Sequence, residues 1–400
     1  MDTRSALLIQ IDGLAQQLLQ VERAVQSQRL DANLRARVGV RFDKLLSQQR
    51  TQISEVRKQA SNNQPNQKCW ENFRQLDMDC RSLFEECLTF IQGALARADG
   101  VDDGMCLLAD NLLDDLAAWA DVGWRRFTLL ARGELYRDTA EIIRIRFPEV
   151  SIWGLPLMAH EFGHFLGPKL SEDEKDGSVY PFQQLLKSAD ENRLPNWQLP
   201  HTKEWYHLNE NFADLFATYS LGPAFACSFI LLRLNPVDAY QEIITHPTHA
   251  KRVHSIFWML DRMDEAEGGF LRPYNALIDR LRNLWRQGLQ EAGQTGSLSD
   301  SEISLLESRL KELHDTLTRT TPPPLAYQLS DWQRSQTIAG ELLSGKVSSS
   351  SQNDSKVSRR DILNAAWFGR LQLDDPDPYR INDIGVRALE LYRRIPPRKV

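Results

Sequence analysis

The sequence predicts a mainly helical protein of the α+β class with one small β-sheet. Apolar residues recur at steps of three and four through much of residues 1–120 and again through 286–400, which is the spacing of one face of an α-helix. Between about residues 124 and 147 the period changes to two, as a strand requires. We therefore expect a helical N-terminal region at 1–120, a central region at 121–285 that contains the sheet, and a helical C-terminal region at 286–400.

Composition and charge are those of an ordinary globular protein. The chain has 400 residues, of which 42% are hydrophobic, and a net charge of −6 with both signs abundant. This balance provides no broad basic surface for nucleic acid or an anionic membrane. No apolar run approaches the length of about 18 residues that a membrane span needs, and no signal peptide is evident. The five cysteines form no C-x-x-C pair, which indicates reduced thiols. We expect a cytoplasmic protein with no membrane or nucleic-acid partner.

Residues 4–60 carry the apolar seam of a coiled coil or helical hairpin. The seam residues follow one another at alternating steps of four and three: Leu7, Ile11, Leu14, Leu18, Val21 and Val25. A polar break at 61–67 ends this unit, and further helices are expected at about 70–98 and 107–119. The N-terminal helices form either a scaffold bundle or an arm through which the chain makes homo- or hetero-oligomers.

Two strands are predicted at 124–130 and 141–147, where β-branched and aromatic residues are frequent. The second alternates apolar and charged residues from Ile143 to Phe147, and Pro148 ends it. We interpret the pair as neighbours in a small antiparallel sheet. An edge strand of this sheet can bind an extended peptide by strand addition.

The stretch 159–167 contains the pattern H-E-x-x-H. His160 and His164 are four residues apart, about one helical turn, so both imidazoles can bind one metal ion and Glu161 can reach a water on that ion. The surrounding residues are apolar, so the helix should be buried, where two unpaired histidines and a glutamate would be costly. A bound metal removes that cost. The alternative is a helix that carries two histidines on its surface.

A third ligand is predicted downstream, in the sequence N-E-N-F-A-D. Leu170 occupies the position of the third histidine in the metzincin pattern H-E-x-x-H-x-x-G-x-x-H, so that pattern is excluded. Glu210 lies on a predicted helix and can be the third ligand. Asp214, one turn later, can accept a hydrogen bond from a ligating histidine and fix its tautomer.

These two motifs resemble those of the gluzincin superfamily, the thermolysin-like zinc metallopeptidases. There an N-E-x-x-x-D helix supplies the glutamate ligand and its supporting aspartate. The run 210–217 also resembles the compact bacterial peptidases of the ImmA/IrrE type, from which it departs by Asp214 in place of asparagine and by a longer gap before Glu210. The likeness covers about a quarter of the chain. It implies a zincin-like catalytic core with a small antiparallel sheet beside the zinc helix, flanked by N- and C-terminal helical regions.

The resemblance implies a zinc-dependent hydrolase that cleaves peptide bonds, with His160, His164 and Glu210 as zinc ligands. Glu161 would take a proton from the zinc-bound water and pass it to the leaving amine. We expect a narrow intracellular protein or peptide substrate. The alternative function is that of a non-proteolytic, metal-binding interaction or regulatory protein built on the same core.

Gluzincins also place a side chain opposite the zinc that stabilises the oxyanion. His246 and Tyr206 are our candidates for that role, and three further residues stay open: His207, His249 and Arg252. His207, three residues before Glu210, is also the candidate for a fourth ligand that closes the site, as a structural zinc site requires.

Two segments are expected to be irregular. Residues 171–203, between the two ligand-bearing helices, are predicted as an acidic loop that is a plain solvated segment, a lid over the cleft or a surface for basic substrates. The Ser-rich stretch near 345–357 is predicted to be flexible. The rest of the C-terminal part should be helical, at 256–289 with an interruption at Gly268-Gly269, and at 301–318, 363–371 and 384–392.

Overall fold

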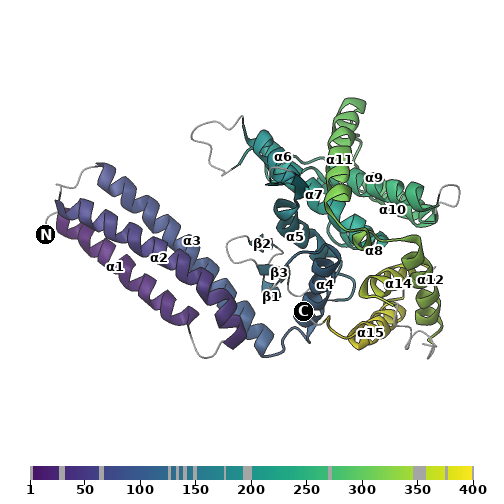
Figure 1. Cartoon of the computed structure of the whole chain (residues 1–400), viewed down its shortest axis with the longest axis horizontal. Coiled ribbons are helices and arrows are strands. Elements are labelled where there is room, and N and C mark those ends of the chain that lie inside the picture. The colour runs from purple at the N-terminus through teal and green to yellow at the C-terminus, as the bar shows by residue number, and fades with distance from the viewer. Residues whose placement is uncertain are drawn as a thin grey trace. The chain divides into compact units, whose positions relative to one another are not determined.

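The computed structural model of the chain is mainly helical, as the sequence predicts (Figure 1). It forms two compact units: unit 1 contains Met1–Cys106 and Arg126–Phe147, and unit 2 contains Leu107–Arg125 and Pro148–Val400. Most of the predicted central region therefore folds together with the C-terminal region. The residues described are 3–26, 32–62, 67–124, 128–131, 135–137, 142–146, 151–174, 177–191, 201–268, 273–345, 357–373 and 377–398.

Unit 1 is built on three long helices that lie side by side (Figure 1). They are α1 (Thr3–Val25), α2 (Ala32–Asn62) and α3 (Gln67–Ala98). Five of the six predicted seam residues are buried between them, and Val21 is partly buried. The core includes apolar residues of all three helices: Leu7, Ile11, Leu14, Leu18, Val25, Phe42, Leu46, Ile53, Cys80, Cys87 and Phe90. The seam therefore forms the core of a bundle within one chain, and an oligomer through these helices stays a prediction.

A three-stranded sheet packs on α3 within unit 1. Strands β1 (Thr128–Ala131), β2 (Leu135–Arg137) and β3 (Ile142–Arg146) lie in the order β1-β3-β2. Gly93 of α3 permits the close contact with β1, because a Cβ atom there would lie 2.4 Å from the carbonyl oxygen of Leu130. No side chain fits in that space.

The strand pairing differs from the predicted antiparallel sheet. β1 and β3 are parallel, and only β2 runs antiparallel to β3. Period-two alternation shows which face of a sheet a residue occupies but carries no information on strand direction. β2 has only three residues, too few for alternation to mark it. The sheet is therefore mixed, and it belongs to unit 1, whereas the predicted ligands belong to unit 2.

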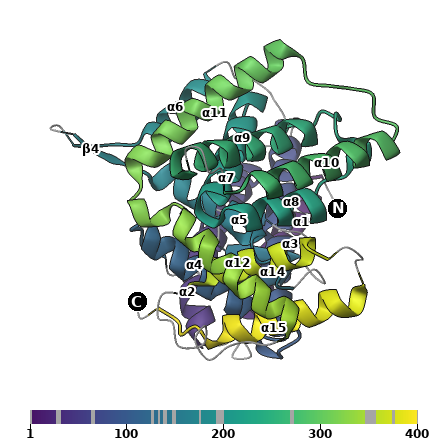
Figure 2. The same ribbon diagram turned by 90° about the vertical axis from the view of Figure 1, so that its right-hand side faces the viewer.

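Unit 2 is organised around helix α7 (Lys203–Leu221), which lies among the other helices (Figure 2). From Leu208 to its end nearly every side chain of α7 is buried. The helices that pack on it are α5 (Leu157–Leu166), α6 (Pro181–Asp190), α8 (Pro223–Leu232), α9 (His249–Gly268) and α11 (Asp300–Thr320). The other elements are α4 (Met105–Trp119), α10 (Asn275–Glu291), α12 (Leu329–Ser344), α14 (Arg359–Leu371), α15 (Pro378–Arg394) and the 3-10 helices η1 (Gly167–Lys169), η2 (Pro236–Asp238) and η3 (Pro323–Leu325).

The C-terminal helices hold the end of α7. Asn364 of α14 donates to the carbonyl of Leu221 and accepts from the amide of Ala224, both at 2.8 Å. On the same helix, Arg359 is buried and pairs with Asp115 of α4 at 2.7 Å. Removing one partner of such a buried pair costs several kcal/mol, about 3–5 in measured cases. The C-terminal region is therefore part of the scaffold of unit 2.

The insertion between the ligand-bearing helices is more regular than predicted. It contains a hairpin of β4 (Glu172–Glu174) and β5 (Gly177–Val179), followed by α6. Phe182 of α6 stacks on Phe212 of α7 with ring centroids 4.2 Å apart. The loop prediction is wrong for these elements. Phe182 and Leu186 are four residues apart, so α6 can bury both on one face and keep its polar residues in solvent.

Two predicted segments lie outside the described residues: 192–200 of the insertion and 346–356 of the Ser-rich stretch. The lid and recruitment hypotheses for the insertion stay predictions. No helix in the described part of the chain is long and apolar enough to cross a membrane.

Candidate metal centre

Helices α5 and α7 pack closely and bring the predicted ligands together. Gly163 of α5 permits this approach, because a Cβ atom there would lie 2.9 Å from the Cα atom of Ala213 on α7. On another side of α5, the ring of Trp124 meets the rings of Phe162 and Phe165 at 5.0 and 4.8 Å. Aromatic packing and helix contact therefore fix the orientation of α5, on which both predicted histidine ligands lie.

The three predicted ligands form one cluster. The Nε2 atoms of His160 and His164 are 3.2 Å apart. Glu210 of α7 places Oε2 3.4 Å from Nε2 of His160 and Oε1 3.4 Å from Nε2 of His164. His160 and Glu210 are buried. Among the described residues, this is the group of histidine, cysteine and acidic side chains whose geometry can hold a metal ion.

The spacing and chemistry of these donors fit a tetrahedral ion. Ligands that bind zinc at about 2.0–2.2 Å with tetrahedral angles lie about 3.3–3.6 Å apart. This is close to the 3.2 Å between the two Nε2 atoms and the 3.4 Å from each of them to an oxygen of Glu210. Two imidazoles and one carboxylate are a set that zinc accepts, although imidazole also suits iron, copper and nickel. The cluster can therefore hold a metal ion.

Asp214 supports the first histidine, one turn after Glu210 on the same helix. Its Oδ1 atom lies 2.9 Å from Nδ1 of His160, and the carboxylate is fully buried. A carboxylate accepts, so Nδ1 donates. This bond turns Nε2 of His160 toward the cluster, as expected for the partner of a metal ligand.

Arg252 of α9 pairs with both carboxylates of the cluster, and its Nη2 atom also lies 3.4 Å from Nε2 of His160. Its Nε and Nη2 atoms each lie 2.8 Å from an oxygen of Asp214, and Nη2 lies 3.1 Å from Oε2 of Glu210. The guanidinium is buried and packs over the ring of Phe229 at 4.3 Å. These contacts make Arg252 a counter-charge of two buried carboxylates, a role that the sequence does not indicate, and its predicted oxyanion role stays a prediction.

The charges of the cluster follow from burial and these contacts. Burial lowers the pKa of His160, but Asp214 and Glu210 outweigh it and raise this pKa to about 10. Burial lowers the pKa of His164 to about 4. Burial raises the pKa of Glu210, but Arg252 and the two histidines bring it well below its usual value. Without metal, His160 therefore carries the proton that an ion must displace.

Glu161 is next to the first ligand and 8% exposed. Its charge acts on the same cluster: burial lowers the pKa of Arg252, while Asp214, Glu210 and Glu161 together raise it above its usual value. The carboxylate of Glu161 thus lies within electrostatic reach of the charges around the ligands. Its predicted role as a base stays a prediction.

His246 is the candidate that reaches the ligands from the solvent side. Its Nε2 atom lies 3.5 Å from Oε1 of Glu210, and its side chain is 49% exposed. Its Nδ1 atom is 2.8 Å from the hydroxyl of Thr245. An imidazole here can act on a ligand, a bound water or a substrate.

The other three candidates have partners elsewhere. His207 reaches the carbonyl of Ile243 at 3.1 Å, and the imidazole of His249 bonds the backbone of Asn235. The ring of Tyr206 lies edge-on to the rings of His201 and Trp205, at 6.0 and 5.2 Å.

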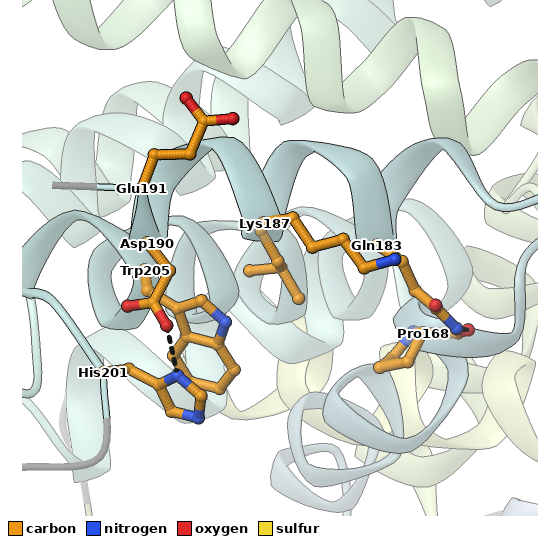
Figure 3. Close-up of a pocket in the computed structure, with 8 residues that line it drawn as sticks. Pro168, Gln183, Lys187, Asp190, Glu191, His201 and Trp205 are labelled. Carbon is orange, nitrogen blue, oxygen red and sulfur yellow. Dashed lines mark hydrogen bonds and ion pairs between the residues drawn. The ribbon is translucent and has the colours of Figure 1, made fainter. Parts of the chain in front are cut away.

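A separate pocket of about 470 Å³ lies between α6, η1 and the start of α7 (Figure 3). Its walls include the stacked rings of His201 and Trp205, 3.9 Å apart, and His201 also pairs with Asp190 at 3.0 Å. None of the three candidate metal ligands lines this pocket. Its full lining is Pro168, Gln183, Leu186, Lys187, Asp190, Glu191, His201 and Trp205.

Comparison with known proteins adds no relative: no protein-family model, no curated protein and no solved structure matches the chain.

Proposed function

We propose that the protein is a zinc-dependent peptidase. The observation that supports this most strongly is the cluster on two packed helices, where the Nε2 atoms of His160 and His164 lie 3.2 Å apart and each lies 3.4 Å from an oxygen of Glu210. Glu161 is next to the first of these histidines. A catalytic zinc site has three protein ligands and keeps its fourth position for water or substrate. Sequence motifs that resemble those of gluzincins support the same proposal.

The side chains of the cluster have complementary roles in this proposal. Zinc, when bound, would act as a Lewis acid and lower the pKa of a water toward about 7. Glu161 accepts a proton from that water and returns it to the leaving amine. Asp214 holds His160 in the binding tautomer, and Arg252 balances the charge of the buried carboxylates. His246, on the solvent side, donates a hydrogen bond to the developing oxyanion.

A second function is supported by the position of His246. If its imidazole completed the coordination of the metal beside Glu210, the site would have four protein ligands, as structural zinc sites do. The protein would then be a metal-stabilised interaction protein. The two proposals predict different results for the removal of Glu161, which is a base in the first and has no chemical task in the second.

The test is the variant Glu161→Gln, compared with Glu265→Gln on the exposed surface of α9. Purified proteins are loaded with zinc, their metal content is measured, and cleavage of unfolded casein and of a pool of random peptides is followed by mass spectrometry. We expect Glu161→Gln to retain one zinc and lose at least about 100-fold in rate, while Glu265→Gln behaves like the parent. A zinc-loaded parent that cleaves nothing, or a Glu161→Gln variant as fast as the parent, would refute the peptidase proposal.

A further inference from the structure

His246 is carried by a tight turn near the metal centre. The turn is closed by an antiparallel bridge between Ile243 and His246. It brings Nε2 of His246 to 3.5 Å from Oε1 of Glu210, although the side chain is half exposed. An exposed imidazole on a short turn keeps this place only if the turn itself is held.

Helix α7 holds the turn through two side chains on the face that also carries Glu210. His207 lies three residues before Glu210 and contacts the carbonyl oxygen of Ile243 through Nε2 at 3.1 Å. Lys203, one turn earlier, pairs with Glu242. The two contacts reach consecutive residues of the loop. Since residues three and four apart lie on one face of a helix, one rigid helix fixes both the ligand Glu210 and the start of the turn.

The bond to Ile243 defines the protonation of His207. A carbonyl oxygen only accepts, so Nε2 of His207 carries the hydrogen and donates. Burial lowers the pKa of His207, as do Lys203 and Lys251, against the opposing effects of the Ile243 carbonyl and Glu242. The ring is therefore neutral near pH 7, with its one N–H already used. Nε2 of His207 is therefore used by the Ile243 carbonyl, and the fourth-ligand role of His207 stays a prediction.

We propose that His207 is a positioning residue, which holds the Ile243 carbonyl and thereby fixes the turn that places His246 beside the metal ligands. The hydroxyl of Thr245 both donates and accepts, so it can support either tautomer of His246. His246 can thus donate from Nε2 to an oxyanion or offer the Nε2 lone pair to the metal. In both cases the position of the turn decides whether the imidazole reaches its target.

This inference rests on the proposed metal centre. The catalytic rate should depend strongly on the distance between His246 and its target. A catalytic group displaced by about 1 Å loses on the order of 100-fold in rate. Loss of the His207 hydrogen bond should therefore lower kcat while KM changes little, because His246 is assigned to the transition state and not to substrate binding.

The test compares His207→Ala, His207→Gln and the control His249→Ala, each checked for parent-like circular dichroism. In metal-free protein, hydrogen exchange of the amides of 243–246 is measured. We expect about tenfold faster exchange in His207→Ala, since one hydrogen bond contributes up to about that factor. The amide of glutamine can donate to the same carbonyl, so His207→Gln should restore slow exchange. Exchange in His207→Ala equal to the parent would overturn the proposal.

A second measurement uses the cobalt-loaded proteins, in which protons of rings near the ion show paramagnetic NMR shifts. We expect shifted signals from His160, His164 and His246 in the parent and in His249→Ala. In His207→Ala the His246 signals alone should return toward their diamagnetic positions. Retained His246 shifts in this variant would overturn the positioning role and leave the metal centre intact. Absence of any shifted histidine signal in the parent would refute the metal centre itself.

Discussion

Substitution of Gly163 by alanine tests how far the metal centre depends on the contact between α5 and α7. A methyl group at this position would lie 2.9 Å from the Cα atom of Ala213 and 3.3 Å from the Cδ1 atom of Phe216. The nearest of these is backbone, which does not rotate away as a flexible side chain does. The two helices must therefore move apart.

The displacement follows from ordinary contact distances. Carbon atoms pack at about 3.5 Å or more, so the helices separate by roughly half an ångström. The ligands sit on opposite sides of this contact, and the separations of 3.4 Å between Glu210 and the two histidines would grow by a similar amount. We expect zinc affinity to fall about 10–100-fold, as for other disturbances of the groups that support metal ligands. Overpacking costs about 1–3 kcal/mol, partly offset by the higher helix propensity of alanine.

The assay is a competition of metal-free protein with a chromophoric chelator for zinc, together with urea unfolding. The matched control is Gly340→Ala in α12, where a Cβ atom meets nothing within 4 Å. This control should gain up to about 1 kcal/mol of stability from helix propensity and keep its zinc affinity. If Gly163→Ala bound zinc like the parent and gained stability like Gly340→Ala, the packing argument would be refuted.

Three further predictions concern buried polar groups. Asp214→Asn should weaken zinc binding about 10–100-fold in the same chelator assay, and parent-like affinity would exclude a supporting role. Arg252→Met removes the guanidinium that pairs with Asp214 and Glu210 and leaves the protonated His160 to balance both buried carboxylates. This should cost about 3–5 kcal/mol in urea unfolding of metal-free protein; a loss below about 1 kcal/mol would contradict the assigned pairing. Burial, then Asp79 and Asp77, raises the pKa of the Cys80 thiol to about 11. Cys80 should react with a disulfide reagent far more slowly than the partly exposed Cys69 at pH 8. The unfolded thiol ionises near its ordinary pKa of 9.0, below the folded pKa of about 11. The protonated Cys80 thiol therefore stabilises the fold below about pH 9, and this stabilisation should be lost as the pH rises from about 9 to 11.

The sequence predicted the cluster of candidate ligands because helical spacing is a local property. His160 and His164 share one face of α5 whatever the rest of the chain does, and Glu210 and Asp214 share one face of α7. Burial of the apolar helix then made unpaired polar residues improbable and a metal the simplest explanation. The same reasoning predicted the α1 seam, whose regularly spaced apolar residues lie in or against the core of unit 1.

The missed features depend on contacts between distant residues. Arg252 meets Asp214 across 38 positions of the chain, and no local pattern separates this arginine from one on the surface. Gly163 belongs to the H-E-x-x-H motif, but a glycine is needed there because Ala213 of α7 lies so close. The parallel pairing of β1 with β3 likewise depends on how the chain between the two strands runs, which the strand sequences do not encode. Such contacts are set by tertiary packing, which a single sequence leaves undetermined.

The central claim, that His160, His164 and Glu210 hold a catalytic zinc ion, is tested most directly by anomalous diffraction at the zinc edge from crystals of the zinc-loaded protein. We predict one anomalous peak in unit 2, about 2.0–2.2 Å from Nε2 of both histidines and from a carboxylate oxygen of Glu210, with a non-protein ligand in the fourth position. The account would be contradicted if no peak appeared there, or if a fourth protein side chain completed the coordination.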